Sequence, residues 1–188
     1  MHKKYQFPIN IFIVFEKINF AVYTSEVLTP NHYICYIPKQ WYYGLNIFLK
    51  KELFYNYSFL VEMSAIDTFN YKNIFWKDKS FNTNHRFIQY NMYYHYLIKT
   101  RLTFLVTTDY KLDSIDQLYK NAMWLEREVS EMYGLNYLNK KDSRSLLLDY
   151  SRNEHPLLKD FPCEGYYEIY FDFFENKINY VKNEFIEL

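Results

Sequence analysis

The segment WLEREVSEMYG, Trp124–Gly134, places the charged triplet Glu126-Arg127-Glu128 inside a run that otherwise has the spacing of a buried helix. This spacing predicts a helix over Ala122–Tyr133, with Asn121 as its N-terminal cap and Gly134 as the left-handed residue that ends it. The apolar side of the helix is expected from Trp124, Leu125, Val129, Met132 and Tyr133.

The charged triplet needs an explanation, because charges are costly to bury without partners. One explanation is a solvated helix face, on which Arg127 and Glu131 form a surface ion pair four residues apart. A second is acid–base catalysis, which would need a pocket that the sequence does not show. A third is a contact with a binding partner. Spacing alone leaves all three open.

A second dense segment follows at Leu146–Asp172, LLLDYSRNEHPLLKDFPCEGYYEIYFD. Its prolines, Pro156 and Pro162, favour extended backbone at the residues that precede them, His155 and Phe161. We call Leu146–Tyr166 the C-terminal strip. A surface segment rich in charge and proline more often serves binding than the core does.

The rest of the chain predicts an α+β fold, with a mixed or antiparallel sheet, a few helices on one face and an extended, proline-punctuated C-terminal segment. Residues 1–134 are assigned to the α+β domain, and residues 135–188 to the C-terminal segment, which has little regular structure before a final strand pair. Expected strands cover Phe20–Thr24, His32–Ile37, Phe59–Ile66, Phe87–Lys99, Arg101–Thr107, Tyr166–Asp172 and Ile178–Val181, with a further helix over Trp41–Leu53 and a polar connection over Tyr71–Asn84.

Composition and motifs argue against several function classes. Lys+Arg and Asp+Glu both number 22, so no net charge attracts nucleic acid or anionic lipid. Two cysteines, Cys35 and Cys163, cannot hold an ordinary four-cysteine iron–sulfur cluster, and no zinc spacing or HxxxH pair occurs. Three glycines leave no nucleotide-binding loop, and GxSxG is absent. The apolar run Ile9–Phe15 is too short to span a bilayer.

Aromatic residues make up 22% of the chain, while glycine and alanine are scarce. This bias is typical of an A/T-rich genome and indicates an organellar origin. The same aromatics on expected strands leave one alternative open, a stand-alone module that binds single-stranded RNA, although neutral charge weighs against it.

Both dense segments resemble one known family, the 30-kilodalton-type subunit of respiratory complex I (NADH:ubiquinone oxidoreductase), often encoded in mitochondrial DNA as subunit 9. Trp124–Val129 and Glu131–Leu135 match its W-L-E-R-E-[VA]-x-[DE]-M-[FY]-G-[IL] pattern throughout. The C-terminal strip matches L-x-D-Y-x-x-x-x-H-P-L-x-K-D-F-P-x-x-G-Y, and LVEMSAID at Leu60–Asp67 matches more weakly. The chain departs from the family at Asn139–Ser145, where G-H-P-D-L-R-R is common.

The resemblance implies a structural subunit of the matrix arm at the mitochondrial inner membrane, without an active site of its own. FMN, iron–sulfur clusters and ubiquinone would belong to neighbouring subunits, and the main partner would be the 49-kilodalton-type quinone-site subunit. A corresponding subunit of a plastoquinone-reducing or hydrogenase-type complex is the alternative. The expected interface and structural residues are Trp124, Glu126, Arg127, Glu128, Gly134, Arg144, Asp149, Tyr150, His155, Pro156, Lys159, Asp160, Phe161, Pro162 and Gly165.

Overall fold

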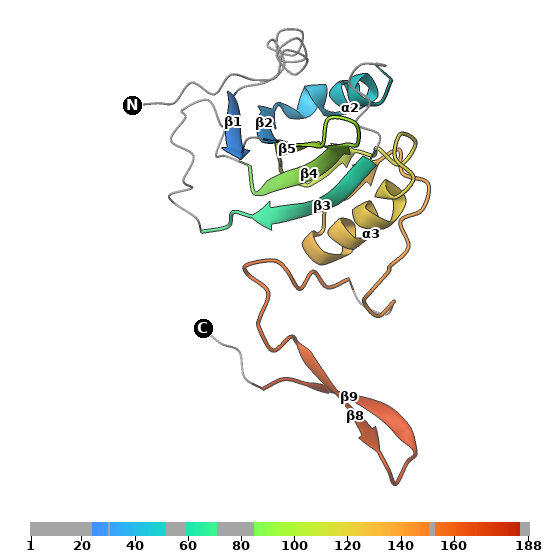
Figure 1. The fold of residues 1–188 in the computed structure, drawn as a ribbon. Helices are drawn as coiled ribbons and strands as arrows, with labels where there is room; N and C mark the ends of the chain where they lie inside the picture. Colours follow the sequence, from blue (N-terminus) through green and yellow to red (C-terminus); the bar gives the residue numbers. More distant parts are fainter. Residues whose placement is uncertain (1–23, 30, 52–58, 71–84, 151–152, 185–188) are drawn as a thin grey trace.

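A five-stranded sheet forms the body of the molecule, and a two-stranded hairpin extends away from it (Figure 1). The structure is a computed structural model that describes residues 24–29, 31–51, 59–70, 85–150 and 153–184. The expected segments over Ile9–Phe15 and Tyr71–Asn84, and nearly all of the expected strand Phe20–Thr24, lie outside these residues.

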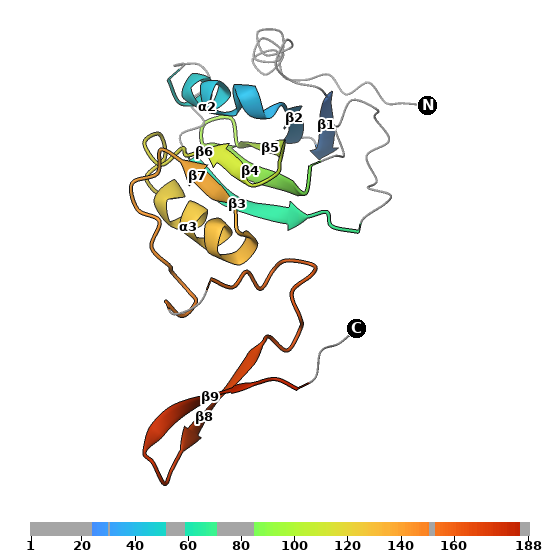
Figure 2. The ribbon, with the colours of Figure 1, turned by 180° about the vertical axis from the view of Figure 1, so that it is seen from behind.

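The sheet has the strand order β1-β2-β5-β4-β3. Only β2 and β5 run parallel among these neighbours, so the sheet is mixed. Two short parallel strands, β6 and β7, form a second sheet beside α3 (Figure 2). The elements are β1 (Thr24–Thr29), β2 (His32–Ile37), η1 (Lys39–Trp41), α2 (Tyr42–Lys51), β3 (Phe59–Asp67), β4 (Phe87–His95), β5 (Thr100–Thr108), β6 (Lys111–Asp113), α3 (Ala122–Tyr133), β7 (Asn136–Leu138), β8 (Tyr167–Asp172) and β9 (Lys177–Lys182).

Both helices cover the same face of the sheet. The alternating side chains Tyr33, Cys35 and Ile37 of β2 join Leu102, Phe104 and Val106 of β5 in one core cluster. The same cluster takes Leu45 and Leu49 from α2 and Ala122 and Val129 from α3. The opposite face holds a smaller cluster of Ile34, Tyr36, Ile88 and Leu105. The expectation of helices on one face is confirmed.

A buried polar network fixes α2 on this face. Asn91 Nδ2 donates to the Tyr42 hydroxyl at 2.6 Å and Gln89 Nε2 donates to it at 3.3 Å. Gln89 Oε1 accepts from the Tyr137 hydroxyl at 2.8 Å, which brings β7 to the same place. The Tyr93 hydroxyl donates to Asn46 Oδ1. Because each of these buried polar groups has a partner, the network specifies one packing arrangement.

One local expectation is wrong. Asn121 stands at the N-terminal end of α3 without a capping hydrogen bond, because its side chain donates to the carbonyl of Leu60 on β3 instead. After residue 134, where little regular structure is expected, one short strand forms. The strand Asn136–Leu138 pairs with Lys111–Asp113, and Leu135 and Tyr137 are core residues. Three residues are too few to show alternation in a sequence.

Candidate subunit interface

Glu126 is fully buried on the inner side of α3. One carboxylate oxygen accepts the amide of Ile115 at 2.7 Å, and the other accepts the Ser114 hydroxyl at 2.7 Å and Lys140 Nζ at 2.9 Å. Burial raises the pKa of Glu126, and these hydrogen bonds oppose that shift. The carboxylate thus joins α3 to the loop after β6 and to Lys140.

Arg127 is also buried, and it binds backbone rather than a neighbouring acid on the helix. Its Nε donates to the carbonyl of Arg144 at 2.7 Å and its Nη2 donates to that of Ser145 at 2.8 Å. Asp142 lies 3.7 Å from Nη1. The guanidinium also lies 5.1 Å from the centre of the Trp124 ring. Arg127 therefore holds the turn that leads from β7 into the C-terminal strip.

These positions correct the expected helix face. A solvated face is wrong for Glu126 and Arg127, and Arg127 does not form a surface pair with Glu131. Trp124 does not anchor the helix in the core either, because 51% of it is exposed. Glu128 alone in the triplet is exposed. The spacing of residues shows which side chains share a face of the helix. Which face is buried depends on segments that lie far away in the sequence.

Glu131 binds the start of the C-terminal strip. Its two carboxylate oxygens accept the amides of Leu146, Leu147 and Leu148 at 2.7 to 3.1 Å. Burial tends to raise the pKa of Glu131, but the three backbone donors outweigh it and hold the pKa below its ordinary value. A carboxylate with three amide donors is a strong local anchor.

The end of α3 is capped by the middle of the strip. His155 Nδ1 donates to the carbonyl of Glu131 at 2.7 Å, and the amide of Leu157 donates to that of Met132 at 3.1 Å. The last carbonyls of a helix have no partner within it, so these contacts satisfy two of them. Gly134 is left-handed, with φ of 73°, and a Cβ there would lie 2.9 Å from His155 Cδ2. The prediction that Gly134 ends the helix in this conformation is confirmed.

A carboxylate–guanidinium–carboxylate chain ties the strip to the sheet edge. Arg86 forms a two-pronged pair with Asp67, at 3.1 Å from Nε and 2.9 Å from Nη2, and its Nη2 also contacts Asp160. Asp67 Oδ2 further accepts the amide of Lys159 at 2.9 Å. Burial would raise the pKa of Asp67, but its hydrogen bonds from Arg86 and two backbone amides lower it overall.

The expected interface residues leave out four residues that make these contacts: Asp67, Arg86, Glu131 and Lys140. Asp67 closes the LVEMSAID motif and Glu131 lies within the WLEREVSEMYG segment, so both had a signal in the sequence. Lys140 lies in the segment that departs from the family pattern, and nothing in the sequence around Arg86 marks it. The anchors at Glu126, Glu131 and Arg86 all act on backbone or on charged groups distant in sequence.

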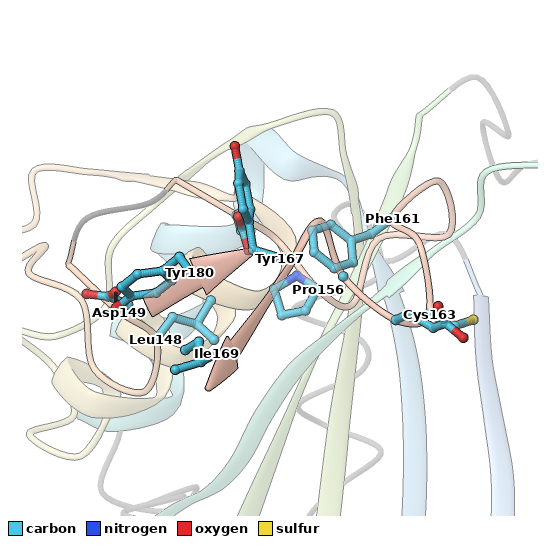
Figure 3. A pocket seen from close by; sticks show the side chains of 11 residues that line it. Leu148, Asp149, Pro156, Phe161, Cys163, Tyr167, Ile169 and Tyr180 are labelled. Atoms are coloured by element: carbon cyan, nitrogen blue, oxygen red, sulfur yellow. Dashed lines mark hydrogen bonds between the residues drawn. The ribbon is translucent and has the colours of Figure 1, made fainter. Parts of the chain in front are cut away.

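Beyond Phe161 the strip leads into the β8–β9 hairpin. Phe161 and Tyr166 meet edge to face at 5.1 Å, the amide of Gly165 donates to the carbonyl of Pro162 at 3.0 Å, and Gly165 is left-handed. The Tyr180 hydroxyl donates to Asp149 at 3.1 Å. A pocket of about 350 Å³ opens here, between the strip and the hairpin (Figure 3).

The remaining predicted site residues lie near these anchors. Arg144 is exposed and pairs with Asp142, the Tyr150 hydroxyl donates to the carbonyl of Ser145, and Pro156 lines the pocket. The structure thus brings the C-terminal strip onto α3 and the sheet edge. Whether these residues contact another subunit stays a prediction.

Among the described residues, no group of three His, Cys, Asp or Glu side chains could hold a metal ion. Cys35 is buried in β2 and Cys163 is exposed in the strip. The helices of the described part are all too short or too polar to cross a membrane.

Comparison with known proteins decides the family. The family model described as "Respiratory-chain NADH dehydrogenase, 30 Kd subunit" matches residues 35–167. The chain belongs to this family. It is 40% identical to NADH-ubiquinone oxidoreductase subunit 9 of Paramecium primaurelia, with 98% of this chain and 88% of the relative covered. It is 29% identical to a bacterial relative, an NADH-quinone oxidoreductase subunit of Cereibacter sphaeroides, over 89% of this chain and 74% of the relative.

The fold is that of two solved structures. A trypsin-resistant fragment of Nqo5 superposes with a TM-score of 0.59 at 17% identity, covering 71% of this chain and 99% of the fragment. A chain of an archaeal membrane-bound sulfane sulfur reductase gives 0.61 at 15% identity, covering 80% of this chain and 82% of that one. The sequence relatives favour the complex I family over a plastoquinone- or hydrogenase-type complex and over an RNA-binding module.

Proposed function

We propose that this member of the 30-kilodalton family is a non-catalytic subunit of the matrix arm of mitochondrial NADH:ubiquinone oxidoreductase. It would hold the quinone-reduction module in shape while neighbouring subunits carry out electron transfer coupled to proton pumping. One observation carries the proposal: the charged side chains of Glu126, Arg127 and Glu131 form hydrogen bonds with backbone groups of their own chain. A general acid or base would instead face a substrate pocket.

The proposal includes the absence of a redox centre in this chain, with FMN, iron–sulfur clusters and ubiquinone held by its neighbours. The two cysteines support it, since a four-cysteine cluster needs twice as many. Burial raises the pKa of the Cys35 thiol, which disfavours the thiolate that binds metals. A direct membrane span and a nucleic-acid partner are not part of the proposed role.

The proposed main partner is the 49-kilodalton-type quinone-site subunit, bound at the C-terminal strip on the matrix side of the inner membrane. The strip suits an interface because hydrogen bonds hold its backbone at Leu146, Leu157 and Lys159 while several of its side chains are exposed. Leu147, Tyr150, Leu157 and Tyr166 are all between 45 and 77% exposed. A preordered surface loses less conformational entropy when it binds.

A mild-detergent extract of mitochondria tests the proposal. Native gel electrophoresis should place this chain in a large complex with NADH dehydrogenase activity, and mass spectrometry of cross-linked lysines should join it to the 49-kilodalton-type subunit. The purified chain should show no flavin or iron–sulfur absorbance. Recovery as a monodisperse, RNA-binding monomer would refute the proposal.

A further inference from the structure

The register of the β8–β9 hairpin places five of its exposed apolar side chains on one face, against Tyr170 and Val181 on the other. Ile169 pairs with Tyr180 and Phe171 pairs with Ile178, while Tyr167 lies on the same face opposite Lys182. These five apolar residues are 45 to 61% exposed. The other face carries Glu168, Tyr170 and Asp172 from β8, and Lys177, Asn179 and Val181 from β9.

This amphipathic hairpin stands away from the body, as both ribbon views show (Figures 1 and 2). A two-stranded hairpin without a covering layer is marginally stable in water. A contiguous exposed apolar face on a soluble protein usually marks an interaction site. The apolar face of the hairpin is therefore expected to be covered by another polypeptide.

The pocket at the base of the hairpin continues this face onto the C-terminal strip. Tyr167, Ile169 and Tyr180 of the hairpin line it together with Leu148, Pro156 and Phe161 of the strip (Figure 3). Its charged lining consists of Asp149, Glu154 and Glu164, with no basic side chain among the lining residues. The pocket is apolar with an acidic edge.

The charge of the surrounding chain has the same sign. Residues 149–188 contain nine acidic and four basic residues, although the whole chain is neutral. A second copy of the hairpin would bring the same negative charge to the contact, and like charges across an interface are unfavourable. A positively charged occupant is complementary.

We propose that the pocket and the apolar hairpin face bind one segment of a neighbouring polypeptide, in which a lysine or arginine is flanked by apolar side chains. The basic group lies against Glu164 and the other pocket carboxylates, and the flanking residues cover Ile169 and Phe171. The long apolar stem of lysine or arginine suits such a pocket, because it packs while its head stays polar. The inference rests on the proposed function, since the neighbour is another subunit of the same complex.

Carboxylate footprinting of the intact complex tests the proposal on the native chain. A carbodiimide with glycine ethyl ester labels accessible carboxylates. We expect Glu164 to be labelled about fivefold more slowly in the complex than in the isolated full-length chain, because a carboxylate paired with a basic group at an interface is shielded from the reagent. Equal labelling of Glu164 in both samples overturns the inference. If the chain does not copurify with other NADH dehydrogenase subunits, the proposed function fails first.

Variants that change the charge of Glu164 test whether the bound segment is positively charged. Raising KCl should release Glu164→Lys from the complex at a lower concentration than Glu164→Leu, and Glu164→Leu at a lower concentration than the native chain. Glu168→Lys, on the other face of the hairpin, is the matched control and should behave like the native chain. An apolar occupant would tolerate Glu164→Leu, and a general field effect would weaken Glu168→Lys equally. Either result overturns the inference, as does a homodimer joined through the hairpin.

Discussion

Replacing Arg127 by alanine should destabilise the C-terminal strip and reduce assembly of the complex. The change removes two hydrogen bonds from a charged donor, to the carbonyls of Arg144 and Ser145 at 2.7 and 2.8 Å. Hydrogen bonds of this kind contribute about 1.5–3 kcal/mol each. The freed carbonyls regain water, so we expect a loss of about 3 kcal/mol of unfolding free energy. That loss lowers the ratio of folded to unfolded chain roughly a hundredfold.

Two assays separate stability from chemistry. Urea unfolding of the full-length chain, followed by far-UV circular dichroism, measures the free-energy change. Native gels measure the amount of assembled complex, and NADH:ubiquinone activity is then normalised to that amount. Arg127→Ala should lower assembly and leave turnover per assembled complex unchanged. Glu128→Gln, on the exposed side of the same helix, should stay within about 0.5 kcal/mol of the native chain.

Either of two results would refute this reasoning. If Arg127→Ala unfolds at the same midpoint urea concentration as the native chain, the buried guanidinium contacts are not stabilising. Normal assembly with abolished turnover would show that Arg127 takes part in the reaction itself. Arg127→Lys adds a graded test, because lysine keeps the charge but loses the forked geometry that reaches two carbonyls at once.

Three further substitutions test the other anchors. Gly134→Ala should lower the free energy of unfolding by about 2 kcal/mol in a thermal melt, because φ is 73° and the new Cβ would meet His155. Gly44→Ala in α2 is the control: its Cβ would meet nothing within 4 Å, so the change should be neutral or stabilising. Glu131→Gln should destabilise the chain at neutral pH. The folded pKa of Glu131 lies below its ordinary value of 4.5, so the carboxylate contributes its full stabilisation above pH 4.5 and loses it as the pH falls through the folded pKa. The unfolding free energies of Glu131→Gln and the native chain should therefore converge in acid. A difference that stays constant with pH would contradict the role assigned to Glu131. Arg86→Lys should expose the C-terminal strip to limited proteolysis with the sheet intact, while Arg144→Lys, at an exposed pair, should be cut like the native chain.

The sequence by itself determined the features that depend on neighbouring residues. The helix Ala122–Tyr133 and its left-handed Gly134 match the prediction residue for residue, because periodicity and a C-terminal glycine are local signals. The strand His32–Ile37 and the hairpin of β4 and β5 were likewise found from apolar and β-branched content. The α+β class followed from the order of these elements.

Only the tertiary structure decided which side of α3 is covered. The charged triplet is mostly inside because Lys140, the loop at Ser114 and the turn at Ser145 close over it, and each lies 12 to 18 residues from its partner on the helix. The sheet-edge anchor spans more still, with Asp67 and Lys159 separated by 92 residues. A sequence pattern reports which residues share a face, but burial of a charge depends on partners that folding brings from elsewhere in the chain.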